Sequence, residues 1–100
     1  MPNTVFELNG TTLTVKPAGE LDSMTSPVFE EELLRHLPGA QRIIVDFENV
    51  DYISSAGLRV FLAAEQTLES RGAEMKLIHV SDYILEIFDL VGFQDIVTVE

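Results

Sequence analysis

The sequence predicts an α/β fold in which a mixed β-sheet begins with a β-hairpin and is packed by amphipathic helices. Three features predict it: two strand-like segments around an N-terminal turn, apolar residues spaced by three and four positions further along, and a short run that is apolar throughout. Helix and strand patterns then alternate to the C-terminus, which favours helices covering a sheet. We expect residues 1–100 to form one domain, since this length supports a single core.

The hairpin is predicted from residues 5–8 and 12–16. Asn9-Gly10 lies between them and is typical of a two-residue type I′ turn, because both residues tolerate positive φ. Beyond the turn, apolar and polar residues alternate, as in a strand with one buried face. Residues 19–22 are predicted to form a loop.

The first helix is predicted to begin with Ser26 as N-cap and Pro27 as first helical residue, where a missing N–H costs nothing. Its apolar residues recur every fourth position, at Phe29, Leu33 and Leu37. The acidic run 30–32 is best explained as a solvated face near the positive end of the helix dipole. Pro38-Gly39 ends the helix.

The remaining elements follow from the same patterns. The continuous apolar run 43–45 indicates a strand covered on both faces. The others are predicted as a helix over 57–71 ended by Gly72, a strand over 75–80, a helix capped by Ser81 and ended by Gly92, and a possible edge strand over 96–99.

Composition excludes several functions. The chain has 6 basic and 17 acidic residues and a net charge of −11, which disfavours nucleic acid and anionic membrane surfaces as partners. No apolar run approaches the roughly 18 residues of a membrane span, so we expect no membrane insertion and a cytoplasmic protein. The absence of cysteine excludes disulfides and thiolate catalysis.

No catalytic or metal-binding set is predicted. His36 lies near a helix C-terminus, where a cation is favoured, and His79 lies in an apolar strand, so structural roles are preferred for both. Asp46, Glu48 and Asp51 lack the spacing of a calcium loop. We therefore expect no metal and no cofactor.

The chain is not expected to be an enzyme. A hydrolase would need a nucleophile such as Ser55 beside a base such as His79, and that base would need a group to orient it. Nothing in the spacing of these residues suggests such a set.

Residues 46–58 are the most informative segment. They run from the end of a strand to the start of a helix, with Ser54 and Ser55 at the expected N-cap. One of these serines caps the helix in the simplest interpretation. A phosphate is also well placed there, since backbone N–H groups and the helix dipole stabilise negative charge. It would act as a binding switch rather than a folding switch.

The helix that follows has an ambiguous flank. Leu58 and Leu62 share a stripe with Glu65 and Glu69, beside the stripe predicted to face the core. Either the leucines complete the edge of the core, or they form an apolar contact patch bordered by acids and adjacent to the serines.

Three segments resemble the STAS domain, and within it the bacterial anti-sigma factor antagonists. Residues 19–22, Gly-Glu-Leu-Asp, resemble the first loop of that family, and residues 46–58 resemble its central Asp-Ser-Ser/Thr-Gly-Leu-Gly motif. Residues 90–93, Leu-Val-Gly-Phe, followed by Ile96, are similar to its C-terminal signature. The resemblance covers nearly the whole chain.

The resemblance implies a function and a site. The chain would bind an ATP-dependent anti-sigma factor serine kinase and so release a sigma factor. Phosphorylation of Ser55 would end binding, and a PP2C-type phosphatase would reverse it. The implied partner-binding residues are Asp22, Ser54, Ser55, Gly57, Leu58, Arg59 and Leu62. The alternative is a STAS interaction module of another assembly, either a stress-signalling scaffold or a lipid or solute transporter.

The chain departs from the motif at three positions. Ser54 replaces the aspartate before the phosphorylated serine, Ala56 replaces the second hydroxyl residue, and Arg59 replaces the glycine after the leucine. Arg59 adds a cation one helical turn from Ser55, where it can pair with a phosphate.

Overall fold

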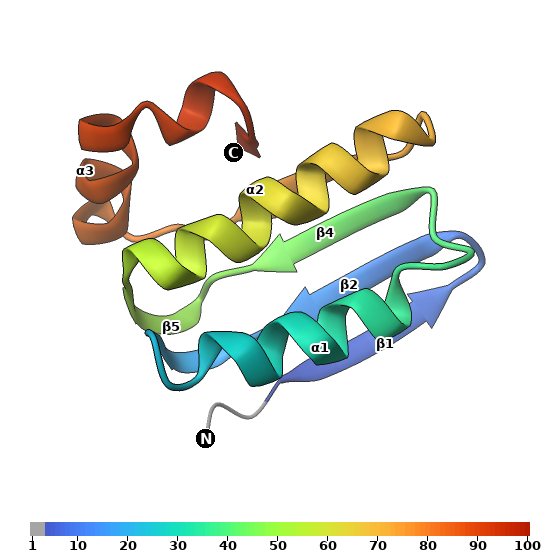
Figure 1. Cartoon of the computed structure of the whole chain (residues 1–100), viewed down its shortest axis with the longest axis horizontal. Helices are drawn as coiled ribbons and strands as arrows, with labels where there is room; N and C mark the ends of the chain where they lie inside the picture. The colour runs from blue at the N-terminus through green and yellow to red at the C-terminus, as the bar shows by residue number, and fades with distance from the viewer. Residues whose placement is uncertain (1–3) are drawn as a thin grey trace.

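A five-stranded sheet forms the base of the molecule. The structure is a computed structural model that describes residues 4–100. Its strands run in the order β1-β2-β4-β6-β7, with β1 antiparallel to β2 and the other neighbours parallel (Figure 1). Their bounds are Val5–Asn9 for β1, Thr12–Lys16 for β2, Arg42–Asp46 for β4, Glu74–Ile78 for β6 and Thr98–Val99 for β7. The predicted mixed sheet with an N-terminal hairpin is confirmed.

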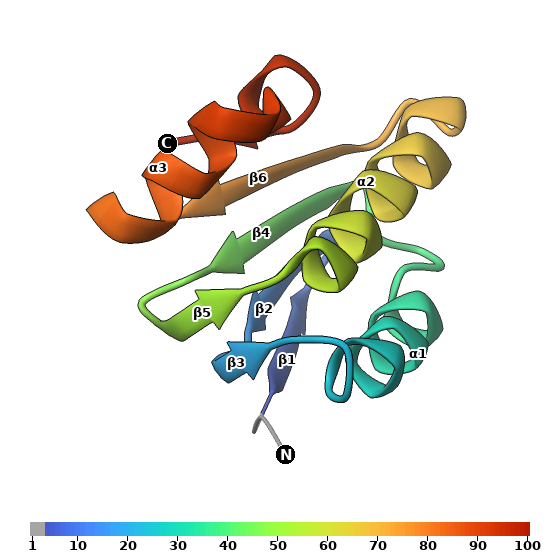
Figure 2. The ribbon, with the colours of Figure 1, turned by 60° about the vertical axis from the view of Figure 1, so that its left-hand side comes forward.

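A second sheet pairs two short strands, β3 (Ala18–Leu21) and β5 (Asn49–Ile53), in parallel. They lie side by side beyond the ends of β2 and β4 (Figure 2). Pro17 separates β2 from β3 because it has no N–H for a ladder, and the register shifts between Gly19, at φ 81°, and Glu20. The prediction of a loop over 19–22 is therefore wrong for all but its last residue.

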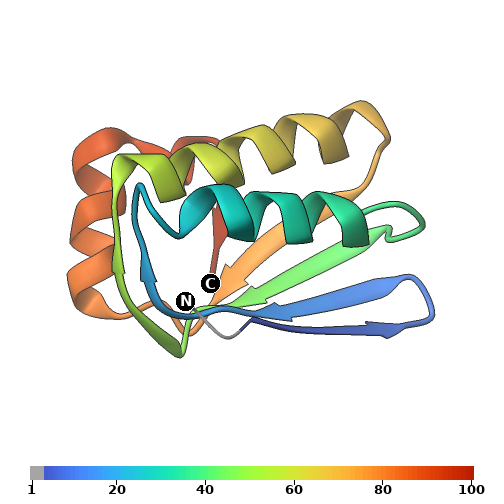
Figure 3. The ribbon, with the colours of Figure 1, turned by 60° about the horizontal axis from the view of Figure 1, so that its bottom comes forward.

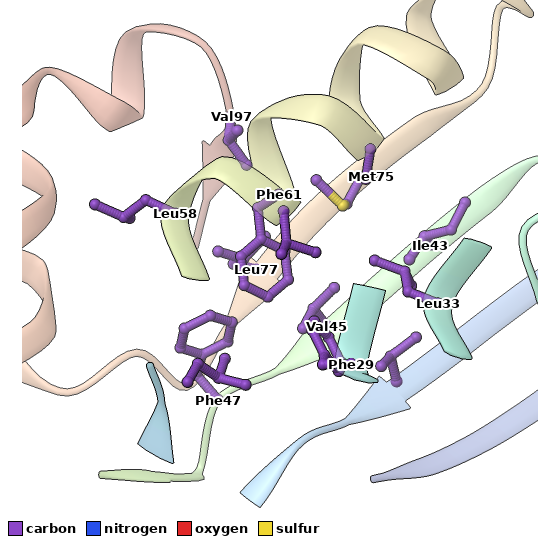
Figure 4. Close-up of a cluster of buried hydrophobic side chains, with 14 of the residues drawn as sticks. Phe29, Leu33, Ile43, Val45, Phe47, Leu58, Phe61, Met75, Leu77 and Val97 are labelled. Atoms are coloured by element: carbon purple, nitrogen blue, oxygen red, sulfur yellow. The ribbon is translucent and has the colours of Figure 1, made fainter. Parts of the chain in front are cut away.

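The helices lie on one side of the five-stranded sheet (Figure 3). They are α1 (Ser26–His36), α2 (Ser55–Ser70) and α3 (Asp82–Val91), followed by the 3-10 turn η1 (Phe93–Asp95). Side chains from β4 and β6 meet α1 and α2 in a buried cluster that includes Phe29, Val45, Phe61 and Leu77 (Figure 4). The predicted core face of α1 is confirmed, since Phe29, Leu33 and Leu37 are all buried.

The opposite face of the sheet is open and polar. Ile43 and Val45 are buried under the helices, whereas Ile44 between them is half-buried. The prediction that 43–45 is covered on both faces is therefore wrong, although one buried face suffices to hold the strand. Ion pairs join neighbouring strands on this open face: Lys16–Asp46, Arg42–Glu74 and Lys76–Glu100.

Two predicted turns are placed differently. Asn9 pairs with Thr12, so the hairpin loop is Gly10-Thr11, and only Gly10 has positive φ, at 60°. A type I′ turn needs two such residues, so that prediction is wrong. Ser26 is the first residue of α1 rather than its N-cap, which is Thr25.

The ends of the other helices match the prediction more closely. α2 begins two residues earlier than expected. Ser81 caps α3 by accepting from the Ile84 N–H at 3.3 Å, and Gly92 ends it at φ 68°. The expected edge strand is reduced to Thr98–Val99 beside β6.

A pair of adjacent leucines on α1 tests this packing. Leu33 is fully buried and Leu34 is 47% exposed. We expect Leu33→Ala to lower the free energy of unfolding by about 2–5 kcal/mol, because it leaves a cavity between α1 and the sheet. Leu34→Ala is the matched control and is expected to change it by less than about 1 kcal/mol. Urea unfolding of both variants measures the difference, and equal losses would contradict the placement of α1.

Candidate functional site

The site is organised around the backbone carbonyl of Leu21, at the end of β3. The Ser54 N–H donates to this oxygen at 2.9 Å, and the Ser54 hydroxyl donates to it at 3.3 Å. Ser54 follows β5 directly and precedes α2. These two bonds therefore fix the start of α2 against the end of β3.

Gly57 brings the first turn of α2 close to the same carbonyl. A Cβ at position 57 would lie 2.7 Å from the Leu21 oxygen and 2.7 Å from Cγ1 of Ile53. Real Cβ atoms do not approach other heavy atoms so closely, so glycine is required by space rather than by its backbone angles. Gly57 thus has a positioning role at the base of the site.

The two serines differ in their surroundings. Ser54 occupies the N-cap position of α2, but its side chain makes no capping hydrogen bond because its hydroxyl is directed to Leu21. The expectation that a serine side chain caps this helix is therefore wrong. Ser55 is the first residue of α2 and is exposed, and within residues 4–100 its hydroxyl has no hydrogen-bond partner. Ser55 is the free hydroxyl at a helix N-terminus whose N–H groups favour anions.

Asp22 shapes the turn between β3 and α1, beginning one residue after Leu21. Its Oδ1 accepts from the backbone N–H groups of Met24 at 2.9 Å and Thr25 at 3.0 Å. These hydrogen bonds, first from Thr25 and then from Met24, lower the pKa of Asp22 below its ordinary value. The carboxylate therefore supports the start of α1.

Two grooves flank the N-terminal half of α2. One has a volume of about 230 Å³ and lies between α1 and α2. The other has a volume of about 220 Å³ and lies between α2 and the segment that joins α3 to β7. Arg59 borders both, and among the Lys and Arg side chains of the described chain it alone has no ion-pair or hydrogen-bond partner.

The two leucines on the flank of α2 have different environments. Leu58 is buried at 7% exposure, and it points from α2 away from Phe61 toward α3 (Figure 4). Leu62 is half-buried and packs against the core. Leu58 therefore completes the core, as one of the two interpretations holds, yet both leucines line the groove beside Ser55.

His79 lies apart from Ser55, on the open side of the sheet. It is exposed, just after β6, and its Nδ1 lies 3.0 Å from Oδ1 of Asp46. Asp46 follows the alternation of β4 away from the helices and also faces Lys16 at 3.9 Å. His79 thus lies outside the core, and the geometry places it with Asp46 rather than with Ser55.

Opposing effects act on Asp46. Burial raises the pKa of its carboxyl, but the Glu48 N–H, His79 and Lys16 together lower it below the ordinary value.

In residues 4–100, no three His, Asp or Glu side chains gather as a metal site would require. No helix in the same range is long and apolar enough to span a membrane.

The structure gathers the predicted site residues around one point. Six of them lie on the first half of α2 or just before it. The seventh, Asp22, follows Leu21, whose carbonyl accepts a hydrogen bond from Ser54. Sequence reasoning missed Leu21 itself and the far wall of the second groove, formed by Val91, Phe93 and Ile96. The apolar run near the end of α3 was the signal available for that wall.

The STAS domain model matches residues 3–100, and the chain belongs to the STAS domain family. The family resemblance expected from the three segments is thereby confirmed. Two relatives are both named anti-sigma-B factor antagonist. The one from Staphylococcus aureus (strain NCTC 8325 / PS 47) is 37% identical and covers 85% of this chain and 80% of its own length. The one from Bacillus subtilis (strain 168) is 28% identical and covers 97% and 89%.

A solved structure shows the same fold. It is the phosphorylated form of the Bacillus cell fate determinant SpoIIAA, with a TM-score of 0.75, 19% identity, and coverage of 98% of this chain and 91% of that one.

Replacing Gly57 tests the close approach of α2 to Leu21. We expect Gly57→Ala to lower the free energy of unfolding by about 1–3 kcal/mol, because the added methyl meets a backbone oxygen that cannot move freely. Ser55→Ala, two residues away and exposed, is the control and is expected to stay within about 0.5 kcal/mol of wild type. Denaturant unfolding measures both, and a stabilised Gly57→Ala would contradict the contact.

The Asp22 turn predicts a pH dependence. Because the folded pKa lies below the ordinary value of 3.8, the ionised carboxylate stabilises the fold at neutral pH, and this contribution is lost as pH falls through the folded pKa. We expect Asp22→Asn to be less stable than wild type at pH 7, with a difference that shrinks below the ordinary pKa. Asp51→Asn, an exposed acid on β5, controls for the change in net charge. A difference independent of pH would show that the charge plays no part.

Proposed function

We propose that this protein is an anti-sigma factor antagonist. In its unphosphorylated form it binds an ATP-dependent anti-sigma factor kinase, and this binding releases a sigma factor. Phosphorylation of Ser55 by the kinase ends the complex, and a PP2C-type phosphatase restores the binding form. The protein itself catalyses nothing in this cycle.

One observation carries the proposal. Ser55 is exposed at the first residue of a 16-residue helix, and its hydroxyl has no hydrogen-bond partner within residues 4–100, in a chain whose relatives are named anti-sigma-B factor antagonists. SpoIIAA, which shares the fold, is known in unphosphorylated and phosphorylated forms. The names of the relatives support the antagonist role, and the geometry of Ser55 supports the site of modification.

The neighbouring serine explains how one hydroxyl is selected. Ser54 stands where the family motif has an aspartate, and its hydroxyl donates to the Leu21 carbonyl. Ala56 has no hydroxyl. Of these adjacent positions, only Ser55 therefore presents a hydroxyl free to accept a phosphoryl group.

A phosphate at Ser55 would be stabilised without refolding. It carries about −1.5 to −2 charges and would face the N–H groups of the first turn of α2. Arg59 lies one turn further along, without another partner in the described chain, and can pair with it. Because the chain already has a net charge of −11, the phosphate would change the total charge little, and its effect would come from its position at the start of α2.

The partner surface is centred on Ser55. Asp22, Ser54, Gly57, Leu58, Arg59 and Leu62 are proposed to form or support it. Of these, Gly57 and Leu58 are buried and act by shaping the surface, whereas Arg59 is exposed and available for contact.

Incubation with an anti-sigma factor kinase and ATP tests the proposal. We expect a single phosphate on Ser55 in the wild-type protein, none in Ser55→Ala, and full phosphorylation of the control Ser70→Ala, measured by mass spectrometry. We also expect Ser55→Asp to weaken the complex by at least about tenfold, or about 1.4 kcal/mol, relative to Ser55→Ala. The difference between these two variants isolates the negative charge from the loss of the hydroxyl.

Two results would count against the proposal. The absence of both a complex and a phosphate would exclude the antagonist role. Stable co-purification with a larger assembly that is indifferent to Ser55→Asp would favour the alternative STAS module of a scaffold or transporter.

A further inference from the structure

Strand β1 is an open edge of the five-stranded sheet. It pairs with β2 alone, and no residue within 4–100 pairs with its outer side (Figure 1). The opposite edge is β7, which has only two residues, whereas β1 has five, all in regular register with β2. An edge of this length presents a row of backbone N–H and C=O groups to which another strand can bind.

Strand β1 lacks the features that usually prevent pairing between sheet edges. Its sequence, Val-Phe-Glu-Leu-Asn, contains no Lys and no Pro, and its register with β2 has no bulge. Leu8 is 58% exposed although its cross-strand neighbour Leu13 is buried, and Val5 is 49% exposed. Leu8 lies on the helical face of the sheet and Val5 on the open face, so both faces of this edge present an apolar side chain to solvent.

Two residues of β1 direct their backbone groups outward. The hairpin loop has two residues, so Asn9 and Thr12, which flank it, exchange both hydrogen bonds of a ladder pair. The pattern alternates along an antiparallel ladder. Glu7 therefore also bonds to β2, while Phe6 and Leu8 direct their N–H and C=O groups to the free edge, where a further strand can bind them.

The charge around this edge differs from that of the whole chain. Residues 5–16 contain one acid, Glu7, and one base, Lys16, so this hairpin is neutral within a chain of net charge −11. Glu7 makes no ion pair within the described residues, and Lys16 lies 3.9 Å from its partner Asp46. Two copies of the chain can therefore approach through β1 with less repulsion than through their acidic helices.

The side chains select one register for two antiparallel β1 strands. A two-fold axis at Phe6 places Phe6 opposite Phe6 of the second copy, and Glu7 opposite Val5. An axis at Glu7 would instead set the two Glu7 carboxylates directly against each other. An axis at Leu8 would place Phe6 opposite Gly10, which lies in the turn. Of these three registers, the one centred on Phe6 fits best.

The register centred on Phe6 also brings opposite charges together between the copies. Val5 neighbours Lys16 on β2, and in this register Val5 lies opposite Glu7 of the second copy. Glu7 and Lys16 then lie on the same face of the joined sheet, with backbones about 10 Å apart, a gap that two long side chains can span. The two-fold axis creates this pair twice.

We propose that the protein forms a two-fold symmetric dimer through β1, in which the five-stranded sheets of two copies join into one continuous sheet. Both copies use the same strand, so the contact is isologous and closed, and further copies cannot add to it. None of the residues proposed for kinase binding lies on β1, so this inference does not rest on the proposed function.

Sedimentation equilibrium of the full chain tests the dimer. We expect a Kd on the order of 10–100 µM, because pairing through one strand buries a small interface. Leu8→Lys is expected to weaken the dimer by about tenfold or more, since a lysine on an edge strand opposes pairing. Leu90→Lys is the matched control, because Leu90 is 86% exposed on α3 and the change in charge is the same. It is expected to dimerise like wild type, and thermal unfolding confirms that both variants are folded.

Hydrogen exchange of single amides tests whether β1 is the contact. The Phe6 and Leu8 N–H groups are expected to exchange rapidly in dilute protein and to slow by about tenfold or more as the dimer forms. The Glu7 N–H is the internal control, because it is bonded to β2 in the monomer and is expected to be protected at every concentration.

Single cysteines test the register, because the chain has no cysteine of its own. We expect a short bis-maleimide to link Val5→Cys dimers readily, since the two thiols would lie about 8 Å apart. Two Asn9→Cys residues would lie about 20 Å apart and should link far more slowly. Equal rates for the two variants would overturn the register centred on Phe6.

Two results would overturn the dimer itself. One is a wild-type protein that stays monomeric at about 1 mM, well above the expected Kd. The other is a dimer that Leu8→Lys leaves unchanged, or in which the Phe6 and Leu8 amides exchange as they do in dilute protein. Neither result bears on phosphorylation of Ser55, which the kinase assay tests separately.

Discussion

The carbonyl oxygen of Leu21 is the contact on which the arrangement of the site depends. It accepts two hydrogen bonds from Ser54, and Gly57 packs against it with no room for a side chain. Strand β3, strand β5 and helix α2 therefore meet at one backbone group. Because the Asp22 turn begins at the next residue, a shift of this carbonyl would move Ser55 and the start of α1 together.

Helix α2 is also held in place by aromatic packing against the core. The ring of Phe61 lies between those of Phe29 and Phe47, at centroid distances of 5.5 and 5.4 Å. All three rings are buried, so α2 is anchored to both α1 and the strand end beyond β4. The proposed modification at its exposed first residue would thus change the surface that a partner meets, while the aromatic packing would keep the helix in place.

The periodic elements could be predicted from the sequence, and the elements that shape the site could not. The core stripe of α1 and the capped α3 follow from local spacing. In β3 and β5 the strands are short, and a register shift after Gly19 breaks their alternation. Leu58 is buried on the side of α2 that faces α3, which is distant in sequence (Figure 4), and Asp22 rather than Ser26 organises the start of α1. The local signature of a helix N-terminus was enough to predict the pair Ser54 and Ser55, whereas the choice of Ser55 came from the family resemblance.

The ion pairs on the open face of the sheet give the molecule an electrical polarity. Lys16, Arg42 and Lys76 are matched there with carboxylates. Only three arginines remain to offset the other carboxylates, most of which lie on the helices and their loops. The paired charges of the open face cancel, whereas the helices carry more acids than arginines. A positively charged protein diffusing nearby would be attracted to the helices and repelled by none of the neutral ion pairs, so long-range attraction would favour an approach from the helical side.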